Sequence, residues 1–251
     1  MMAEARSQPG ALSLSVIIPA YNEERGLPET LRSLTAHLAA RPWQWEIRVV
    51  DDGSTDATRQ VVERFSASDL RVRLQAEPHR GKGGAVRAGM LAARADYRFM
   101  CDADLSMPVH EIDRFMPPAL GDIDVAIGSR EGAGARRVGE PFLRHLAGRA
   151  FNSVVRSSTV PGIHDTQCGF KMFTAAAVEA IFPYATVDGW AFDIEVLYIA
   201  RLRQLRVREV PIEWHFRADS RVRMFRDSVS MLRELAAIRA RARRGIYDLR
   251  R

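Results

Sequence analysis

The sequence has no long apolar run, which excludes one class of protein at the outset. No stretch of about 18 apolar residues occurs, although 47% of the 251 residues are apolar. We therefore expect no transmembrane helix. The opening segment, MMAEARSQPGALSLS, also lacks an apolar stretch before a small-residue cleavage site, so we expect no signal peptide. The length and apolar content suffice for one sizeable α/β domain.

Cysteine is scarce, and histidine shows no useful pattern. Cys101 and Cys168 lie in apolar surroundings without CxxC spacing, so we expect two buried thiols of a cytoplasmic protein. The six histidines show no metal-ligand spacing. Any metal site must therefore rely on oxygen ligands, which hard cations prefer.

Excess positive charge is missing from most of the chain. Residues 221–251 carry ten arginines and three acidic residues, whereas the preceding 220 residues carry 27 basic and 28 acidic side chains. RGG repeats and interleaved aromatic residues are absent, so we expect no nucleic-acid partner. We interpret 221–251 as a basic appendage with a partner of its own.

Short apolar strands alternate with helical patterns in the first half of the chain. Strands are expected at 14–18, 46–52, 71–76, 97–101 and 125–129. Helices are expected at 24–39, from an N-cap in DGSTD to residue 65, and from HRGKGGA to residue 94. The alternation predicts an α/β fold with a mostly parallel sheet and helices on both faces. We assign 12–220 to one domain that follows a disordered segment, 1–11.

Polar motifs follow the carboxyl ends of these strands, where parallel sheets bind ligands. The motifs are PAYNEE, DDGSTD, HRGKGG, DADLS and GSRE. In DADLS, Asp102 and Asp104 point the same way if the segment is extended, and two such carboxylates could share a cation. A solvated turn is the alternative for this pair alone. Five motifs at one edge favour a single site.

Seven motifs, taken in order, resemble family 2 glycosyltransferases of the GT-A fold. Within that family the similarity is greatest to dolichyl-phosphate glucosyl- and mannosyltransferase-like enzymes, which act on polyprenyl phosphates. The motifs are SVIIPAYNE, VVDDGSTD, GKGGAVRAGM, DADLS, GSR, DTQCGFKMF and EVPI. The resemblance implies inverting transfer of one sugar from a nucleotide-sugar to polyprenyl phosphate, assisted by Mg²⁺ or Mn²⁺. UDP-glucose is the favoured donor, and GDP-mannose is the alternative.

The resemblance also implies roles for individual residues. Nucleotide binding is expected from Pro19, Ala20, Tyr21, Glu23, Asp52, Lys82, Asp102 and Ala103. Asp102 and Asp104 would hold the metal, although Ser106 replaces a glutamine that mannosyl enzymes often carry. Contacts to the acceptor phosphate or the donor diphosphate are expected from Arg130, Arg144, Lys171 and Arg217. Asp193 lies where related enzymes with hydroxyl acceptors carry their base; with a phosphate acceptor its role would be positional.

The chemistry of such a reaction agrees with these residue types. A divalent ion on carboxylates stabilises the charge of the leaving diphosphate. A lipid phosphate is already anionic, so it needs cations to overcome repulsion more than it needs a base. For each arginine a surface position is the alternative, because the chain has 35 of them, and Lys171 could simply cap a turn.

Other functions remain open from the sequence. A family 2 transferase could use a soluble acceptor. DADLS also loosely fits the DxDx[TS] loop of aspartate-dependent phosphatases, but there the motif follows the first strand, and here three strands precede it. A non-enzymatic adaptor acting through its basic end is a further alternative.

The end of the chain predicts a basic amphipathic helix. One face is expected to hold Phe225, Val229, Leu232 and Ala236, with Met224, Met231, Leu235 and Ile238 widening the apolar stripe. The surrounding arginines suit an anionic membrane surface, so we expect peripheral association with the inner face of the membrane through 221–251. The alternative is a helix that packs on the domain and leaves its arginines in water.

Overall fold

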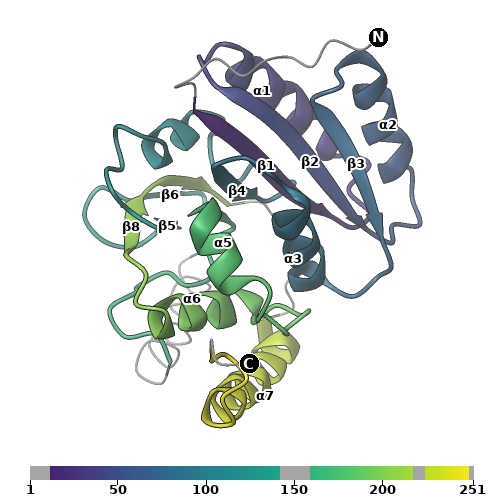
Figure 1. Cartoon of the computed structure of the whole chain (residues 1–251). Helices are drawn as coiled ribbons and strands as arrows, with labels where there is room; N and C mark the ends of the chain where they lie inside the picture. The colour runs from purple at the N-terminus through teal and green to yellow at the C-terminus, as the bar shows by residue number, and fades with distance from the viewer. Residues whose placement is uncertain (1–11, 142–158, 217–223, 249–251) are drawn as a thin grey trace.

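A seven-stranded sheet forms the centre of the fold (Figure 1). The computed structural model describes residues 12–141, 159–216 and 224–248, without the side chains of 224–230 and 232. The strand order is β3-β2-β1-β4-β7-β5-β8, and β6 pairs with β9 in a separate two-stranded sheet. The strands are β1 (Ser13–Ala20), β2 (Gln44–Asp52), β3 (Val72–Glu77), β4 (Tyr97–Cys101), β5 (Val125–Ser129), β6 (Arg136–Val138), β7 (Phe170–Thr174), β8 (Val207–Pro211) and β9 (Glu213–His215).

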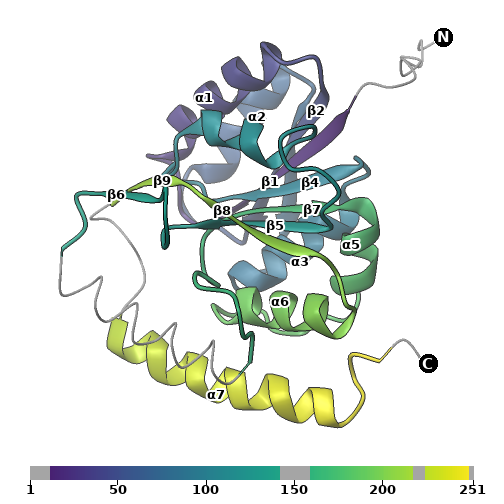
Figure 2. The same cartoon turned by 90° about the vertical axis from the view of Figure 1, so that its left-hand side faces the viewer.

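Helices cover both faces of the large sheet, as the sequence predicts (Figure 2). Val16 and Ile18 of β1 contribute to one core, whereas Ile17 contributes to the other, since successive strand residues point to opposite faces. The first core also contains residues of α1 (Leu27–Ala39), α2 (Thr58–Ser68) and the 3₁₀ helix η1 (Val109–Phe115). The second contains residues of α3 (Lys82–Ala92), α5 (Ala175–Ile181), α6 (Phe192–Leu202) and α7 (Met224–Arg243).

One strand departs from the parallel arrangement. β7 lies between β4 and β5 and runs antiparallel to both, while the other described neighbours pair in parallel. In the β4–β7 register, Cys101 is opposite Phe170. The segment just before β7 therefore lies beside the start of DADLS, which follows β4.

The observed helix starts differ from the predicted ones. α1 begins at Leu27, with Pro28 in its first turn, and not at residue 24, because proline is favoured at the first helical positions. The N-cap of α2 is Ala57, which makes no side-chain cap, so the cap expected within DGSTD is wrong. Asp56 Oδ1 instead accepts a hydrogen bond from Thr58 N at 2.9 Å, in a turn that precedes the helix.

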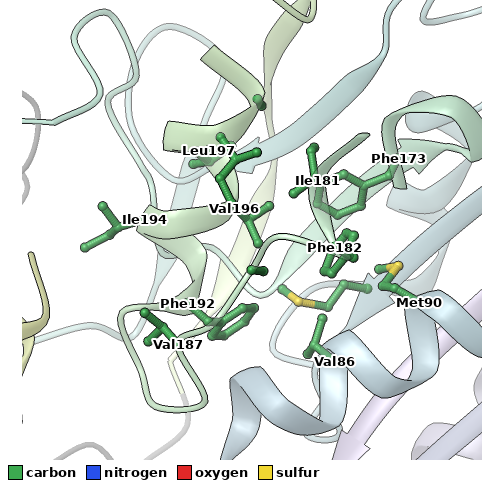
Figure 3. Packing of buried hydrophobic residues seen from close by; sticks show 14 of the residues in the cluster. Val86, Met90, Phe173, Ile181, Phe182, Val187, Phe192, Ile194, Val196 and Leu197 are labelled. Atoms are coloured by element: carbon green, nitrogen blue, oxygen red, sulfur yellow. The ribbon is translucent and has the colours of Figure 1, made fainter. Parts of the chain in front are cut away.

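The second core joins α3, α5 and α6 and fixes the start of α6 (Figure 3). Phe173 and Phe182 meet edge to face, with ring centroids 5.2 Å apart. Gly83 lets α3 approach closely, because a Cβ there would lie 2.4 Å from Val187 O and 2.6 Å from Phe192 Cβ. Phe192 is buried and begins α6, so this packing also positions the next residue, Asp193.

Helix α7 packs on the domain along α6 (Figure 2). Met231, Leu235 and Ile238 are buried in the second core, and so is Tyr247 beyond the helix. Ala236 is exposed, so its assignment to the apolar face is wrong. The other three predicted members of that face, Phe225, Val229 and Leu232, have side chains outside the described set. The described part of 221–251 thus belongs to the domain core, and among the described helices none is long and apolar enough to cross a membrane.

Candidate active site

Five of the predicted site residues line one cavity of about 220 Å³. They come from the start of α3, the loop after β4, the end of β5 and the first turn of α6, and they are Lys82, Asp102, Asp104, Arg130 and Asp193. The other lining residues are Ser106, Met107, Gln167, Cys168, Gly169, Trp190, Trp214, Phe216 and Met231. The cavity combines clustered charge with aromatic and thioether walls.

The DADLS turn is held by two contacts from other segments and by one hydrogen bond of its own. Asp102 N donates to Gly169 O at 3.2 Å, and Thr30 of α1 donates through its hydroxyl to Ala103 O at 2.6 Å. Asp104 Oδ1 accepts from Ser106 N at 2.9 Å. Ala103 thus serves the turn through its carbonyl, and it is buried. A Cβ at Gly169 would lie 1.8 Å from Asp102 Oδ2, so any other residue there would displace this carboxylate.

The only two lysines of the chain both lie at this site. Lys82 Nζ is 2.6 Å from Asp102 Oδ1. Burial is the largest single influence on the pKa of Lys82 and lowers it, but the charges of Asp102, Asp193 and Asp104 together outweigh burial and raise it. The ammonium therefore stays charged among three carboxylates.

Lys171 forms a buried pair with Asp193. Its ammonium donates to Asp193 Oδ1 and to Cys168 O, and both side chains are at most 5% exposed. Burial raises the pKa of the Asp193 carboxyl, while the charges of Lys171 and Lys82 oppose that shift. Lys171 is not among the residues that line the cavity. The structure thus places Lys171 behind Asp193, where it also holds the turn before β7.

Arg130 is anchored by the buried carboxylate of Asp165. Its backbone N, Nε and Nη2 donate to Asp165 at 2.9, 2.7 and 2.8 Å, and Asp165 is fully buried. Burial acts to raise the pKa of Asp165, but Arg130 outweighs it and lowers that pKa. The guanidinium carbon lies 5.3 Å from the ring centroid of Trp214. Arg130 is therefore a preorganised cation at the cavity wall.

Five residues predicted to bind the nucleotide lie outside the cavity lining, at or just after the carboxyl ends of the neighbouring strands β1 and β2: Pro19, Ala20, Tyr21, Glu23 and Asp52. Tyr21, which follows Pro19 and Ala20 at the end of β1, stacks on His79 with ring centroids 4.3 Å apart. Glu23 N donates to the Thr58 hydroxyl at 2.8 Å. The Asp52 carboxylate accepts from Arg80 N at 2.8 Å and Gly81 N at 2.9 Å, so a nucleotide base would have to share its oxygens. Arg144 and Arg217 lie outside the described residues.

Sequence reasoning missed the wall that the end of the chain provides. Met231 of α7 lines the cavity, and its sulfur accepts from Gln167 Nε2 at 3.0 Å. Glu234 accepts from Ala191 N at 3.2 Å, and Tyr247 donates to Glu195 Oε1 at 2.7 Å. Glu195 also accepts from the amides of Thr186 and Val187, so α7 and α6 together hold the loop that carries Trp190. Two further lining residues, Trp190 and Trp214, were also missed. Their occurrence within the motif segments GWAFD and IEWHF was the signal that could have identified them.

Asp102 and Asp104 suit a metal ion whose remaining ligands come from water or from a bound substrate. Within the described ranges no group of three or more His, Cys, Asp or Glu side chains is arranged to hold a metal ion, so Asp102 and Asp104 would supply only part of a coordination shell. Asp102 Oδ1 is buried and accepts no well-aligned hydrogen bond, because Lys82 contacts it as an ion pair only. Such an oxygen suits a hard cation whose other ligands are water and phosphate.

The family is established by the sequence itself. Residues 15–182, well over half of the chain, match the family described as Glycosyl transferase family 2. The chain belongs to this family. As a family 2 glycosyltransferase it is an enzyme, and the adaptor and phosphatase alternatives are not favoured.

Curated relatives of this glycosyltransferase align over nearly its whole length. The dolichyl-phosphate beta-glucosyltransferase of Dictyostelium discoideum is 33% identical, over 99% of this chain and 80% of that protein. The enzyme of the same name from Drosophila melanogaster is 38% identical, over 91% of this chain and 74% of that protein. The resemblance drawn from the seven motifs is therefore confirmed.

A solved structure confirms the GT-A fold. Glucosyl-3-phosphoglycerate synthase from Mycobacterium tuberculosis, crystallised with Mn²⁺, uridine-diphosphate-glucose and phosphoglyceric acid, gives a TM-score of 0.63. The match covers 90% of this chain and 78% of that chain at 19% identity. At this identity the likeness concerns the fold alone.

Proposed function

We propose that this glycosyltransferase moves glucose from UDP-glucose to the phosphate of a dolichyl-type polyprenyl phosphate. The observation that carries the proposal is the alignment with dolichyl-phosphate beta-glucosyltransferases over 91–99% of the chain. The cavity supplies the charge pattern that two anionic substrates require, since carboxylates for a cation and a fixed arginine share its walls. The mannosyl and soluble-acceptor alternatives are not favoured by these relatives.

The chain's own residues divide the work between donor and acceptor. Lys82 would neutralise part of the charge that builds on the departing UDP. Arg130, held by Asp165, would bind the acceptor phosphate and set its line of attack on the sugar. Asp193 would position groups in the cavity, because an anionic nucleophile has no proton to give up. A single in-line displacement of this kind inverts the anomeric carbon.

A divalent metal belongs to the same proposal. Asp102 and Asp104 would hold Mg²⁺ or Mn²⁺, which when bound supplies Lewis-acid stabilisation of the leaving diphosphate. Support comes from the poorly satisfied Asp102 Oδ1 and from the neighbour of the same fold that was crystallised with Mn²⁺. Arg144 and Arg217, outside the described residues, stay predictions as further phosphate contacts.

We also propose that the enzyme works at the cytoplasmic face of a membrane without crossing it. The acceptor lipid resides in the bilayer, and the arginines of 221–251 provide charge for an anionic surface. Arg239, Arg243 and Arg244 of this segment are exposed in the structure. They therefore leave a basic surface even though α7 packs on the domain.

A transfer assay tests the function. Radiolabel from UDP-glucose should appear in the organic extract with a short polyprenyl phosphate as acceptor, and chelator should abolish it until Mn²⁺ or Mg²⁺ is restored. Asp104→Ala should lower turnover at least about a hundredfold, the usual loss for one electrostatic element of a site. Asp69→Ala, at an exposed ion pair with Arg71, is the matched control and should keep wild-type turnover. Equal transfer from GDP-mannose, or transfer to phosphoglycerate and not to lipid, would contradict the proposal.

A further inference from the structure

The Asp102 carboxylate contacts one cation, Lys82, and is proposed to bind a second, the divalent metal. Lys82 Nζ lies 2.6 Å from Asp102 Oδ1, and Asp102 is also a proposed ligand of the divalent metal. The site is only partly open to water, since the Lys82 side chain is 18% exposed and that of Asp102 is 29% exposed. Two positive charges on one carboxylate repel each other strongly in such surroundings. The present position of Lys82 is therefore hard to combine with a bound metal.

Lys82 is free to leave Asp102 in a way that Lys171 is not. Lys171 is 1% exposed and donates to both Asp193 and Cys168 O, so its ammonium is fixed on two sides. Lys82 has one ion-pair partner among the described residues, and its ammonium lies 5.6 Å from the ring centroid of Trp190. A lysine is a compact charge on a flexible stem, unlike the planar guanidinium of arginine, which can donate several hydrogen bonds at once.

We propose that Lys82 stands in for the divalent cation at Asp102 in the metal-free enzyme and moves to the donor diphosphate when metal and nucleotide bind together. The inference rests on the proposed function and adds a reason why the two ligands bind cooperatively. Metal alone must displace Lys82 from Asp102, its one ion-pair partner among the described residues. A nucleotide diphosphate supplies another counter-charge, so each ligand should strengthen the binding of the other by the same factor.

A binding cycle measures this coupling without recourse to activity. Mn²⁺ binding is followed by electron paramagnetic resonance and UDP binding by calorimetry, each with and without the other ligand. Lys82→Met keeps the apolar stem beside Trp190 and removes the charge. We expect this variant to bind Mn²⁺ alone at least about fivefold more tightly than wild type, the lower end of typical coupling. The factor by which UDP tightens Mn²⁺ should fall correspondingly.

Arg80→Gln is the matched control for loss of charge. Arg80 lies two residues away and pairs with Asp188, at 3.1 Å, and not with Asp102. We expect its Mn²⁺ affinity and its coupling factor to equal those of wild type. Circular dichroism checks that Lys82→Met folds. If it does not, the same Mn²⁺ and UDP binding measurements are made on Lys82→Gln.

The outcomes separate this inference from the proposed function. Unchanged or weaker Mn²⁺ binding in both Lys82 variants overturns the inference, and so does an equal gain in Arg80→Gln. In either case, wild-type binding of UDP and Mn²⁺ would leave the proposed function intact. Failure of the wild-type enzyme to bind either ligand would overturn both.

Discussion

At the scale of single residues, Arg130 and Asp165 each depend on the other for a partner of opposite charge. Asp165 is fully buried, and three donors of Arg130 supply its charge partner. Removing one member of a buried ion pair leaves an uncompensated charge, which typically costs about 3–5 kcal/mol. A kinetic effect of any Arg130 variant must therefore be separated from a loss of folded protein.

We expect Arg130→Met to lower the free energy of unfolding by about 3–5 kcal/mol. Arg130→Met combined with Asp165→Asn should recover part of that loss, because the buried charge is gone from the folded state. Urea unfolding followed by fluorescence measures both. A double variant no more stable than the single one would show that Asp165 is not held charged by Arg130.

The two thiols give a pH-dependent prediction at the same scale. Burial raises the pKa of Cys168 to about 12, and the pKa of Cys101 is also raised well above its ordinary value of 9.0 by burial. The folded protein should resist thiol reagents at about pH 8, and both thiols should react in concentrated guanidinium. Above the ordinary thiol pKa the unfolded chain releases protons that the folded chain retains, so stability should fall as pH rises. Rapid labelling of the folded protein would contradict the buried placement.

At the scale of elements, α7 is a test of how far the domain extends. Ile238 is fully buried in the core shared with α6, whereas the next residue, Arg239, is exposed. Ile238→Ala should lower the free energy of unfolding by about 2–5 kcal/mol, while Arg239→Ala should change it by less than about 0.5 kcal/mol. Thermal or urea denaturation checks the pair. Equal, small effects would mean that α7 is dispensable for the core.

Local sequence patterns predicted where the strands and helices lie better than they predicted which elements pack or pair with one another. Short apolar runs located β1, β2, β4 and β5, because strands covered on both faces are apolar almost throughout, and alternation located β3. The antiparallel insertion of β7 left no such trace, since the pairing of Cys101 with Phe170 joins distant segments. The arginines around α7 suggested an appendage separate from the domain, because charge can be counted in a sequence. The burial of Met231 and Tyr247 against the domain cannot be read from the sequence in that way.

The same limit applies to the site. Spacing and loop position brought out Asp102 and Asp104, and the motifs added Lys82, Arg130 and Asp193, all of which meet in the cavity. Which cation faces which carboxylate depends on packing between elements, so the pairs Lys82–Asp102 and Lys171–Asp193 were beyond sequence reasoning. Trp190, in a loop, and Trp214, in the three-residue strand β9, were missed for a similar reason, since neither lies in a periodic apolar segment.

The charge distribution of the whole molecule leads to a membrane prediction. Truncation after Met224, the obvious experiment from the sequence, would remove buried Ile238 and Tyr247 and so destabilise the domain. Replacing Arg239, Arg243 and Arg244 by serine removes exposed charge only. Basic residues contribute roughly 1 kcal/mol each near an anionic bilayer, so this variant should sediment with anionic liposomes far less than wild type.

Salt and lipid composition provide the controls for that measurement. Wild-type binding should weaken at high salt, because surface charge attraction is screened, and it should be small with neutral vesicles. The triple variant should retain the wild-type melting temperature. Equal pelleting with neutral and anionic vesicles would contradict a role for these arginines.

The place of β7 in the sheet also has a consequence for co-translational folding. Strands β1 to β4 occupy residues 13–101 and pair among themselves, so they can assemble while the rest of the chain is still being made. β5 has no partner in that early sheet; its neighbours β7 and β8 are translated tens of residues later. Gly169, which backs Asp102, emerges just ahead of β7. A nascent chain stalled before β7 would thus present a four-stranded sheet, β1 to β4, whose DADLS turn still lacks the contact from Gly169.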